Sequence, residues 1–213
     1  MFKFEDRIEA GKELAKSLHI YANKKNTLIL ALPRGGVPVA YEVAKALSLP
    51  LDVLIVRKLG APGQEELAMG AISLNEVCYL NNELIDSLQV APEELQRVIA
   101  KEKLELERRN QTYRSGRAAP DVTGKTVIIV DDGLATGATM RAAISALREA
   151  NVSRIIVAVP VGPFDTCTKL RSYADEVICL FTPEYFFGVG QWYQNFNQTS
   201  DEEVQAILRP YNP

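Results

Sequence analysis

The sequence is poor in the residues that build metal centres and disulfide frameworks. It contains three cysteines, Cys78, Cys167 and Cys179, which stand far apart without a CxxC spacing, and one histidine, His19. Scattered cysteines exclude a disulfide framework and a cysteine zinc site, and a lone histidine excludes most histidine-based metal sites and catalytic triads. A basic excess is also missing, because 24 lysines and arginines face 27 aspartates and glutamates. We therefore expect no nucleic-acid partner.

Long apolar runs are absent as well. The longest runs, such as Ile155–Pro160, are far shorter than the roughly 20 residues that a membrane span needs. The first residues, Met1–Arg7, carry charges where a signal peptide has its apolar core. We expect a cytoplasmic protein with no membrane partner, and the 213 residues suit a single domain, 1–213.

The sequence does contain short apolar runs without polar alternation, which are typical of strands buried on both faces. They lie at Thr27–Ala31, Val53–Val56, Thr126–Val130, Ile155–Val159 and Val177–Leu180. Apolar stripes with helical spacing occur between them, at Val37–Leu47 and Met140–Leu147, and before them at Ile8–Leu18. This alternation predicts an α/β fold with a mostly parallel twisted sheet flanked by helices.

An insertion interrupts the alternation. The segment from about 57 to 125 is too long for one crossover, and it opens with a polar loop that we expect to be mobile. Two short runs, Ala68–Ser73 and Glu76–Leu80, predict a hairpin, and a long charged helix follows over about Pro92–Arg114. The mixed charges of this helix are most simply a solvated face, with an RNA-binding face as the alternative.

The segment from about 181 to 213 differs from the core, which spans about 27–180. It is rich in aromatic residues and ends in a short helix, because Ser200 and Glu203 form a capping box before an apolar stripe. We interpret this segment as a small hood over the sheet. A peripheral aromatic cluster that only packs is the alternative interpretation.

Chemically unusual residues follow three of the predicted strands. They are Leu32–Gly36, Arg57–Gly63 and Asp131–Thr139. Ligands of open parallel sheets bind beyond the carboxyl ends of the strands, so we expect these three stretches to face one crevice.

The third stretch predicts a pocket for ribose 5-phosphate. The residues Thr136-Gly137-Ala138-Thr139 lead directly into a helix, and small residues let backbone N–H groups point at an anion at its N-terminus. Asp131 and Asp132, just upstream, suit the vicinal hydroxyls of a ribose or a magnesium ion held partly through water.

The first two stretches supply what a pyrophosphate group needs. Arg34, Gly35 and Gly36 offer backbone N–H groups before a helix start. Arg57 and Lys58 add two cations, and charge-assisted hydrogen bonds to phosphate are strong.

Taken together, these three stretches resemble the motifs of a known family. The segment Val127–Thr139, VIIVDDGLATGAT, is similar to the phosphoribosyl pyrophosphate (PRPP) motif of the type I phosphoribosyltransferases. Arg34-Gly35-Gly36 matches the pyrophosphate loop of that family, and Arg57-Lys58 with Pro62-Gly63 resembles its mobile catalytic loop. The resemblance implies a magnesium-dependent pentosyltransferase, in which PRPP loses pyrophosphate from C1 of the ribose and a nitrogen nucleophile attaches.

The resemblance also implies a role for each candidate residue. Asp131 and Asp132 hold the ribose hydroxyls and the magnesium ion, directly or through water or PRPP. The residues that hold the 5-phosphate are Ala135, Thr136, Gly137, Ala138 and Thr139. The leaving pyrophosphate is bound by Arg34, Gly35, Gly36, Arg57 and Lys58, and the four residues expected to be catalytic are Asp131, Asp132, Arg57 and Lys58.

Further expectations concern the loop and the acceptor. The resemblance implies a non-proline cis peptide at Arg34–Gly35, and it places Tyr185 where a base would stack and Trp192 where a purine edge would lie. Ala135 departs from the 6-oxopurine enzymes, which carry an aspartate there, and this argues against hypoxanthine, guanine and xanthine. The expected partners are PRPP and a small aromatic base, and a homodimer is expected.

Three functions therefore stay open. The first is a phosphoribosyltransferase of nucleotide salvage type that acts on a nucleobase or a related acceptor. The second is a non-catalytic PRPP- or nucleotide-binding regulatory protein. The third is a hydrolase of a phosphoribosyl compound, with water as the acceptor.

Overall fold

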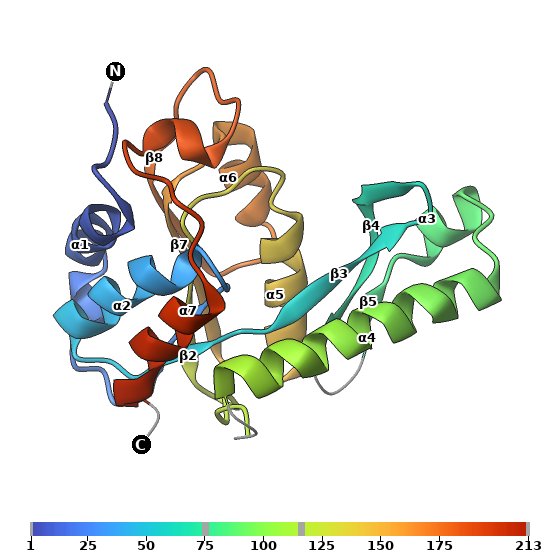
Figure 1. Ribbon diagram of the computed structural model, residues 1–213, viewed down its shortest axis with the longest axis horizontal. Coiled ribbons are helices and arrows are strands. Elements are labelled where there is room, and N and C mark those ends of the chain that lie inside the picture. The colour runs from blue at the N-terminus through green and yellow to red at the C-terminus, as the bar shows by residue number, and fades with distance from the viewer. Residues whose placement is uncertain (1, 74–76, 115–117, 212–213) are drawn as a thin grey trace.

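A five-stranded parallel sheet forms the centre of the molecule (Figure 1). The computed structural model describes residues 2–73, 77–114 and 118–211. The strands of the sheet, in the spatial order β2-β1-β6-β7-β8, are β2 Leu51–Val53, β1 Thr27–Ala31, β6 Thr126–Val130, β7 Arg154–Val161 and β8 Glu176–Phe181. All four strand pairs are parallel, which confirms the predicted α/β fold.

Helices cover both faces of this sheet (Figure 1). Four helices provide the two layers: α1 Arg7–Ser17 and α2 Gly36–Leu47 on one side, and α5 Ala138–Glu149 and α6 Phe164–Leu170 on the other. Successive strand residues alternate between the layers, since Ile128 packs in the cluster with α2 and its neighbours Val127 and Ile129 in the cluster with α5. The strands are apolar without interruption because both faces are buried.

A second, smaller sheet projects from this body as an arm (Figure 1). It is antiparallel and consists of β3 Val56–Ala61, β4 Gln64–Ser73 and β5 Val77–Leu80. The short helix α3 Asn82–Ser87 and the long helix α4 Pro92–Arg114 complete the arm. The predicted hairpin is therefore present as β4 and β5, while its turn residues 74–76 and the side chain of Cys78 lie outside the described residues.

Two expectations for the start of this arm are wrong. The run Val53–Val56 is not one strand, because β2 ends at Val53 and the chain crosses to the second sheet, where β3 begins at Val56. Arg57 and Lys58 do not lie on a loop. They belong to β3 and pair with Ile72 and Ala71 of β4, and such a non-local pairing leaves no signal in the local sequence.

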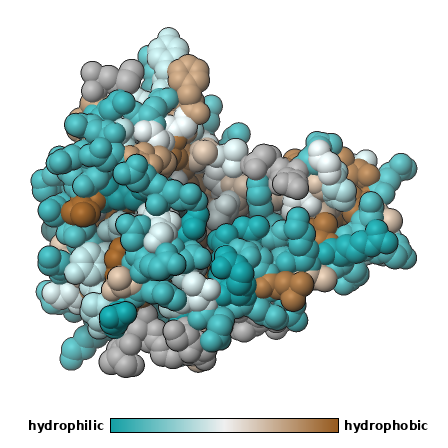
Figure 2. Space-filling view, in the orientation of Figure 1, coloured by the Kyte–Doolittle hydropathy of each residue, from teal (hydrophilic) through white to brown (hydrophobic). Residues whose placement is uncertain are grey.

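Helix α4 has the predicted bounds, but it is more than a solvated face. Its residues Glu102, Leu106, Tyr113 and Arg114 are buried. At its end, Arg114 Nε donates to the carboxylate of Asp52 on β2 at 3.2 Å. The helix thus forms a wall of the molecule, and only its outer face is solvated, where Figure 2 shows a mostly hydrophilic surface.

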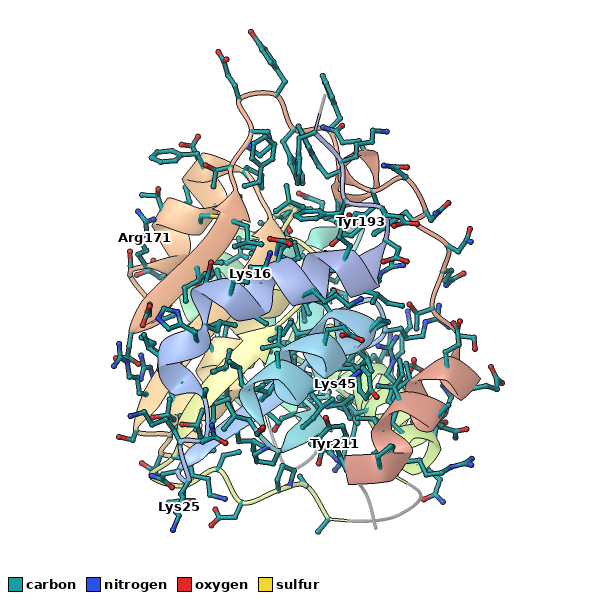
Figure 3. The ribbon with its side chains drawn as sticks, turned by 90° about the vertical axis from the view of Figure 1, so that its left-hand side faces the viewer. Lys16, Lys25, Lys45, Arg171, Tyr193 and Tyr211 are labelled. Atoms are coloured by element: carbon teal, nitrogen blue, oxygen red, sulfur yellow. The ribbon has the colours of Figure 1, made fainter. Side chains whose placement is uncertain are left out.

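The aromatic segment after β8 closes over the start of the chain. The backbone N–H of Phe4 donates to Trp192 O at 2.9 Å, and Gln194 N–H donates to Phe4 O at 2.8 Å. Figure 3 shows Tyr193 beside the beginning of α1. This segment contains the 3₁₀ turn η2 Val189–Trp192 and is followed by α7 Asp201–Leu208 and the 3₁₀ turn η3 Arg209–Tyr211; a third such turn, η1 His19–Tyr21, follows α1. The predicted capping box at Ser200 is confirmed.

None of the helices within the described ranges is long and apolar enough to span a membrane.

Candidate functional site

The loops that follow β1 and β6 pack directly against each other at the carboxyl edge of the sheet. A β-carbon on Gly35 would collide with the carboxylate of Asp132, and one on Gly36 would lie 2.7 Å from Val130 O. Gly35 has a φ of −59°, which any residue adopts. The two glycines are therefore required by space, and they bring two of the three predicted stretches together.

The cis peptide bond of the first loop lies one residue earlier than expected. It joins Pro33 to Arg34, instead of Arg34 to Gly35. Gly35 already has helical backbone angles as the N-cap of α2, and Gly36 N–H donates to Leu32 O at 3.1 Å. This bond occupies one of the expected N–H donors, whereas no described group accepts a hydrogen bond from Gly35 N–H.

The loop before α5 has the form of an anion cradle. Gly137 is its N-cap residue with a φ of +74°, a conformation that favours glycine. Within the described residues, no group accepts a hydrogen bond from the backbone N–H of Thr136, Gly137 or Thr139. Both threonines and Ala135 are exposed, whereas Gly137 is buried between them. Unpaired N–H groups at a helix N-terminus form an anion-binding site.

Arg7 contacts the acidic pair, and sequence reasoning missed it. Its Nε donates to Asp132 Oδ2 at 2.9 Å, and a second nitrogen lies 2.8 Å from the same oxygen. The guanidinium also stacks 4.0 Å from the ring centre of Phe196 and donates to Asn197 O at 2.6 Å. Arg7 therefore joins α1, the loop after β6 and the hood segment. Nothing in the local sequence around Arg7 marks this role, because its partner lies 125 residues away.

The two aspartates differ in their surroundings. Burial, together with the charge of Asp132, raises the pKa of Asp131 well above its usual value. Burial also raises the pKa of Asp132, but the neighbouring Arg7 opposes this. The Asp131 carboxylate accepts the N–H of Asp132 at 2.8 Å, and no described cation forms an ion pair with it. Asp131 is consequently the carboxylate left for a ligand.

The donor set fits a magnesium ion that is shared with a substrate. Magnesium in proteins is usually held by one or two carboxylates, with substrate phosphates and water completing its shell. The Asp131 carboxyl group accepts the N–H of Asp132 and also hydrogen-bonds with the Asp132 side chain, whereas Arg7 holds Asp132 Oδ2. Because no described cation forms an ion pair with Asp131, it fits the role of a direct ligand, and Asp132 fits a role through water.

The second stretch lies in a cavity next to these loops. This cavity has a volume of about 360 Å³ and is lined by Arg57 and Lys58 of β3. Pro33 and Thr139 also line it, so it adjoins both the first loop and the anion cradle. The third side is α4, from which Glu102 accepts a hydrogen bond from Arg57 Nε at 2.6 Å. The carboxylate of Glu102 thereby fixes the guanidinium of Arg57 in the cavity wall.

The structure does not bring every predicted residue to this place. The Arg34 side chain points to α7, where it lies 3.6 Å from Asp201. Tyr185 is 70% exposed, and its backbone oxygen accepts a hydrogen bond from Gln191 Nε2 at 3.3 Å. Trp192 is buried against Phe181, and its Nε1 has no partner among the described residues. The hood segment thus combines an exposed tip with the packed aromatic cluster of the alternative interpretation.

The comparisons with known proteins give a consistent family. The family model for the phosphoribosyl transferase domain matches residues 3–194. A Mycobacterium tuberculosis protein (Rv0571c), whose name provisionally places it among the phosphoribosyl transferases, is 49% identical over 205 residues. That match covers 96% of this chain but 46% of the relative, so the chain spans about half the length of the mycobacterial protein.

Two solved structures show the same arrangement of elements. The crystal structure of TT1426 from Thermus thermophilus has a TM-score of 0.89 with 39% identity and covers 100% of both chains. A hypoxanthine-guanine phosphoribosyltransferase from Bacillus anthracis has a TM-score of 0.50 with 15% identity and covers 92% of each chain, which shows the fold alone.

Proposed function

This chain belongs to the phosphoribosyl transferase domain family, and from this premise we propose that it transfers ribose 5-phosphate from PRPP to a nucleobase or a related acceptor and releases pyrophosphate. The observation that carries the proposal is the anion cradle of Thr136, Gly137 and Thr139 beside the acidic pair. A phosphate held by the cradle places the ribose of the same molecule over the aspartates.

In the proposed reaction the acidic pair would bind the ribose and hold a magnesium ion. Asp131 accepts hydrogen bonds from the vicinal hydroxyls or holds the ion, and Arg7 keeps Asp132 oriented beside it. Magnesium, when bound, neutralises charge on the departing pyrophosphate. The donors aimed at that group are Gly35 N–H and the side chains of Arg57 and Lys58, each contributing a few kcal/mol of electrostatic stabilisation.

The acceptor site lies between the cavity and the hood. The exposed ring of Tyr185 is available to stack on an aromatic base, as the family resemblance implies. Ala135 leaves no carboxylate for the edge of a 6-oxopurine. We therefore propose a small aromatic base other than hypoxanthine, guanine or xanthine.

Phosphorus NMR of the protein with magnesium, PRPP and pooled nucleobases tests the proposal. We expect growth of a pyrophosphate signal together with a new phosphomonoester, and omission of single bases then identifies the acceptor. The same products without bases would mean hydrolysis. A perturbed PRPP signal without turnover would mean a regulatory binding protein, and an unperturbed signal would contradict the whole proposal.

A double variant tests whether the acidic pair, Asp131 and Asp132, binds PRPP. Asp131→Asn with Asp132→Asn should abolish PRPP binding, because the ribose hydroxyls and magnesium lose their ligands. The matched control is Asp121→Asn, since Asp121 is exposed and hydrogen-bonds to Thr123 two residues along the chain. Unchanged PRPP affinity in the double variant, with circular dichroism showing an intact fold, would mean that the pocket is assigned wrongly.

A further inference from the structure

Helix α4 provides one complete wall of the cavity beside the anion cradle. The α4 residues that line it are Val98, Lys101, Glu102 and Arg109. Their spacing of three, four and eleven residues from Val98 puts them on one face of the helix. Thr139 of the cradle also lines the cavity, so a ligand that fills it contacts both α4 and Thr139.

Within the described residues, the lining of this cavity holds more cations than carboxylates. Arg57 of β3 and Lys101 and Arg109 of α4 line it together with the carboxylate of Glu102. That carboxylate is engaged by Arg57 at 2.6 Å. Like charges gathered in a partly enclosed space repel one another, and a bound anion relieves this repulsion.

The two α4 cations are held differently. Arg109 Nε donates to Glu105 one turn earlier at 2.7 Å. Hydrogen bonds from Arg108 and Arg109 lower the pKa of Glu105 to about 2, so this carboxylate stays ionised and keeps the Arg109 guanidinium in place. For Lys101, no ion pair with another described residue is present. One cation is therefore fixed at the wall and the other is available to a ligand.

We propose that Lys101 and Arg109 bind an oxyanion group of a substrate in this cavity. The inference rests on the proposed function and deepens it, because it makes the long charged helix a part of the substrate site. Two sources carry such a group: the diphosphate of PRPP, or a carboxylate or phosphate on the acceptor. Both offer the charge-assisted hydrogen bonds that guanidinium and ammonium groups make best.

The size of the cavity supports this proposal. Its volume of about 360 Å³ falls in the range of small-molecule sites. Lys101 and Arg109 stand eight residues apart, which is about 12 Å along the helix axis. They therefore bracket the cavity, and a ligand with extended charge contacts both.

Titration calorimetry with inorganic pyrophosphate and magnesium tests the site without any turnover. The variants are Lys101→Ala and Arg109→Gln, and the control is Lys103→Ala, an exposed lysine two residues further along the same helix that does not line the cavity. We expect the Kd of pyrophosphate to rise about tenfold in each cavity variant, since one charge-assisted contact is lost, and to change less than twofold in the control.

A second measurement distinguishes the two sources. If pyrophosphate binding is unchanged but the KM of the acceptor found by NMR rises in both cavity variants, the oxyanion belongs to the acceptor. If both quantities match those of Lys103→Ala, the proposal is overturned. The pyrophosphate titration needs no reaction, so it separates this inference from the proposed function. If the protein shows no transferase activity but the cavity variants still lose pyrophosphate affinity, the proposed function alone is refuted.

Discussion

At the scale of single residues, Arg7 decides the state of the acidic pair. Burial raises the pKa of both carboxyl groups, and the charge of Asp132 raises the pKa of Asp131 further. Arg7 places its guanidinium against Asp132, so one of the two carboxylates has an ion-pair partner. Asp132 is thereby held in place, and Asp131 stands beside it without an ion pair to any described cation. In the proposed reaction Arg7 would therefore act through Asp132, as a positioning residue.

The variant Arg7→Ala should weaken PRPP binding more than tenfold and lower the free energy of unfolding by about 2 kcal/mol, because a half-buried charged pair loses one partner. For a chain of this size that loss corresponds to about 4–8 °C in Tm. Calorimetric titration and thermal melting measure the two effects. Arg7→Lys should recover part of the affinity, whereas Lys12→Ala, an exposed change on the same helix, should leave both quantities unchanged. Equal PRPP affinity in wild type and Arg7→Ala would refute the positioning role.

The sequence predicted residues of the loops far better than their distant partners. Asp131, Thr136 and Thr139 could be singled out as candidates because they lie within nine consecutive positions after an apolar run. Arg7 and Glu102 could not be identified, because each gains its meaning from a contact across the fold. A charged residue in an amphipathic helix looks the same whether it faces solvent or an ion pair.

At the scale of elements, α4 and α7 are joined by one carboxylate. Asp201, the first residue of α7, accepts the hydroxyl of Tyr113 at 2.7 Å and lies 3.5 Å from an Arg108 nitrogen. It also lies 3.6 Å from Arg34 in the loop after β1. The hydrogen bond from Tyr113 and the two arginines lower the pKa of Asp201. This carboxylate therefore couples the cavity wall, the last helix and the first loop of the site.

The pH dependence of stability should reveal that junction. A carboxyl group whose pKa is depressed in the folded state stabilises the fold above its unfolded pKa of about 3.8, and the contribution is lost as the pH falls below that value. Wild type should be more stable than Asp201→Asn at pH 7, and the difference should shrink between about pH 4 and pH 3. Urea unfolding at several pH values measures it. Glu107→Gln, an exposed change on α4, is the control, and a difference independent of pH would contradict the ionic role of Asp201.

Element boundaries could be predicted from the sequence where the local pattern of apolar residues determines them. The bounds of β1, β6 and α4 agree with the apolar runs and the helical stripe, since burial or periodicity is visible locally. The boundary between β2 and β3 was not, because the apolar character continues through Leu54 and Ile55 while the chain changes sheets. Likewise β3 carries Arg57, Lys58 and Gly60, which resemble a loop until β4 pairs with the strand.

At the scale of the whole molecule, the arm and the body share one core. Leu106 and Tyr113 of α4 belong to the same buried cluster as Ile29 of the central sheet and Leu208 of α7. A shared core predicts a single cooperative unfolding unit, because neither part retains its packing when the other unfolds. The predicted cytoplasmic location and the predicted homodimer stay predictions.

Thermal unfolding should therefore show one transition. Circular dichroism reports the helices, and the fluorescence of Trp192, the single tryptophan, reports the hood segment. Both probes should give the same Tm, and magnesium with PRPP at about 100 times its Kd should raise both by about 5–10 °C, from about 2.7 kcal/mol of linked binding. Separate transitions for the two probes would contradict the single unit.

The pairing of Phe4 with the backbone around Tyr193 has a consequence for the order of folding. The two segments of this isolated bridge lie far apart in the described chain. During synthesis the segment at Phe4 leaves the ribosome before the residues after β8 and cannot pair with them until they follow. Contacts of such high order form late. We therefore expect the contact between Arg7 and Asp132 to form after the central sheet, and on the proposed function a nascent chain would bind PRPP only once the residues after β8 have joined the fold.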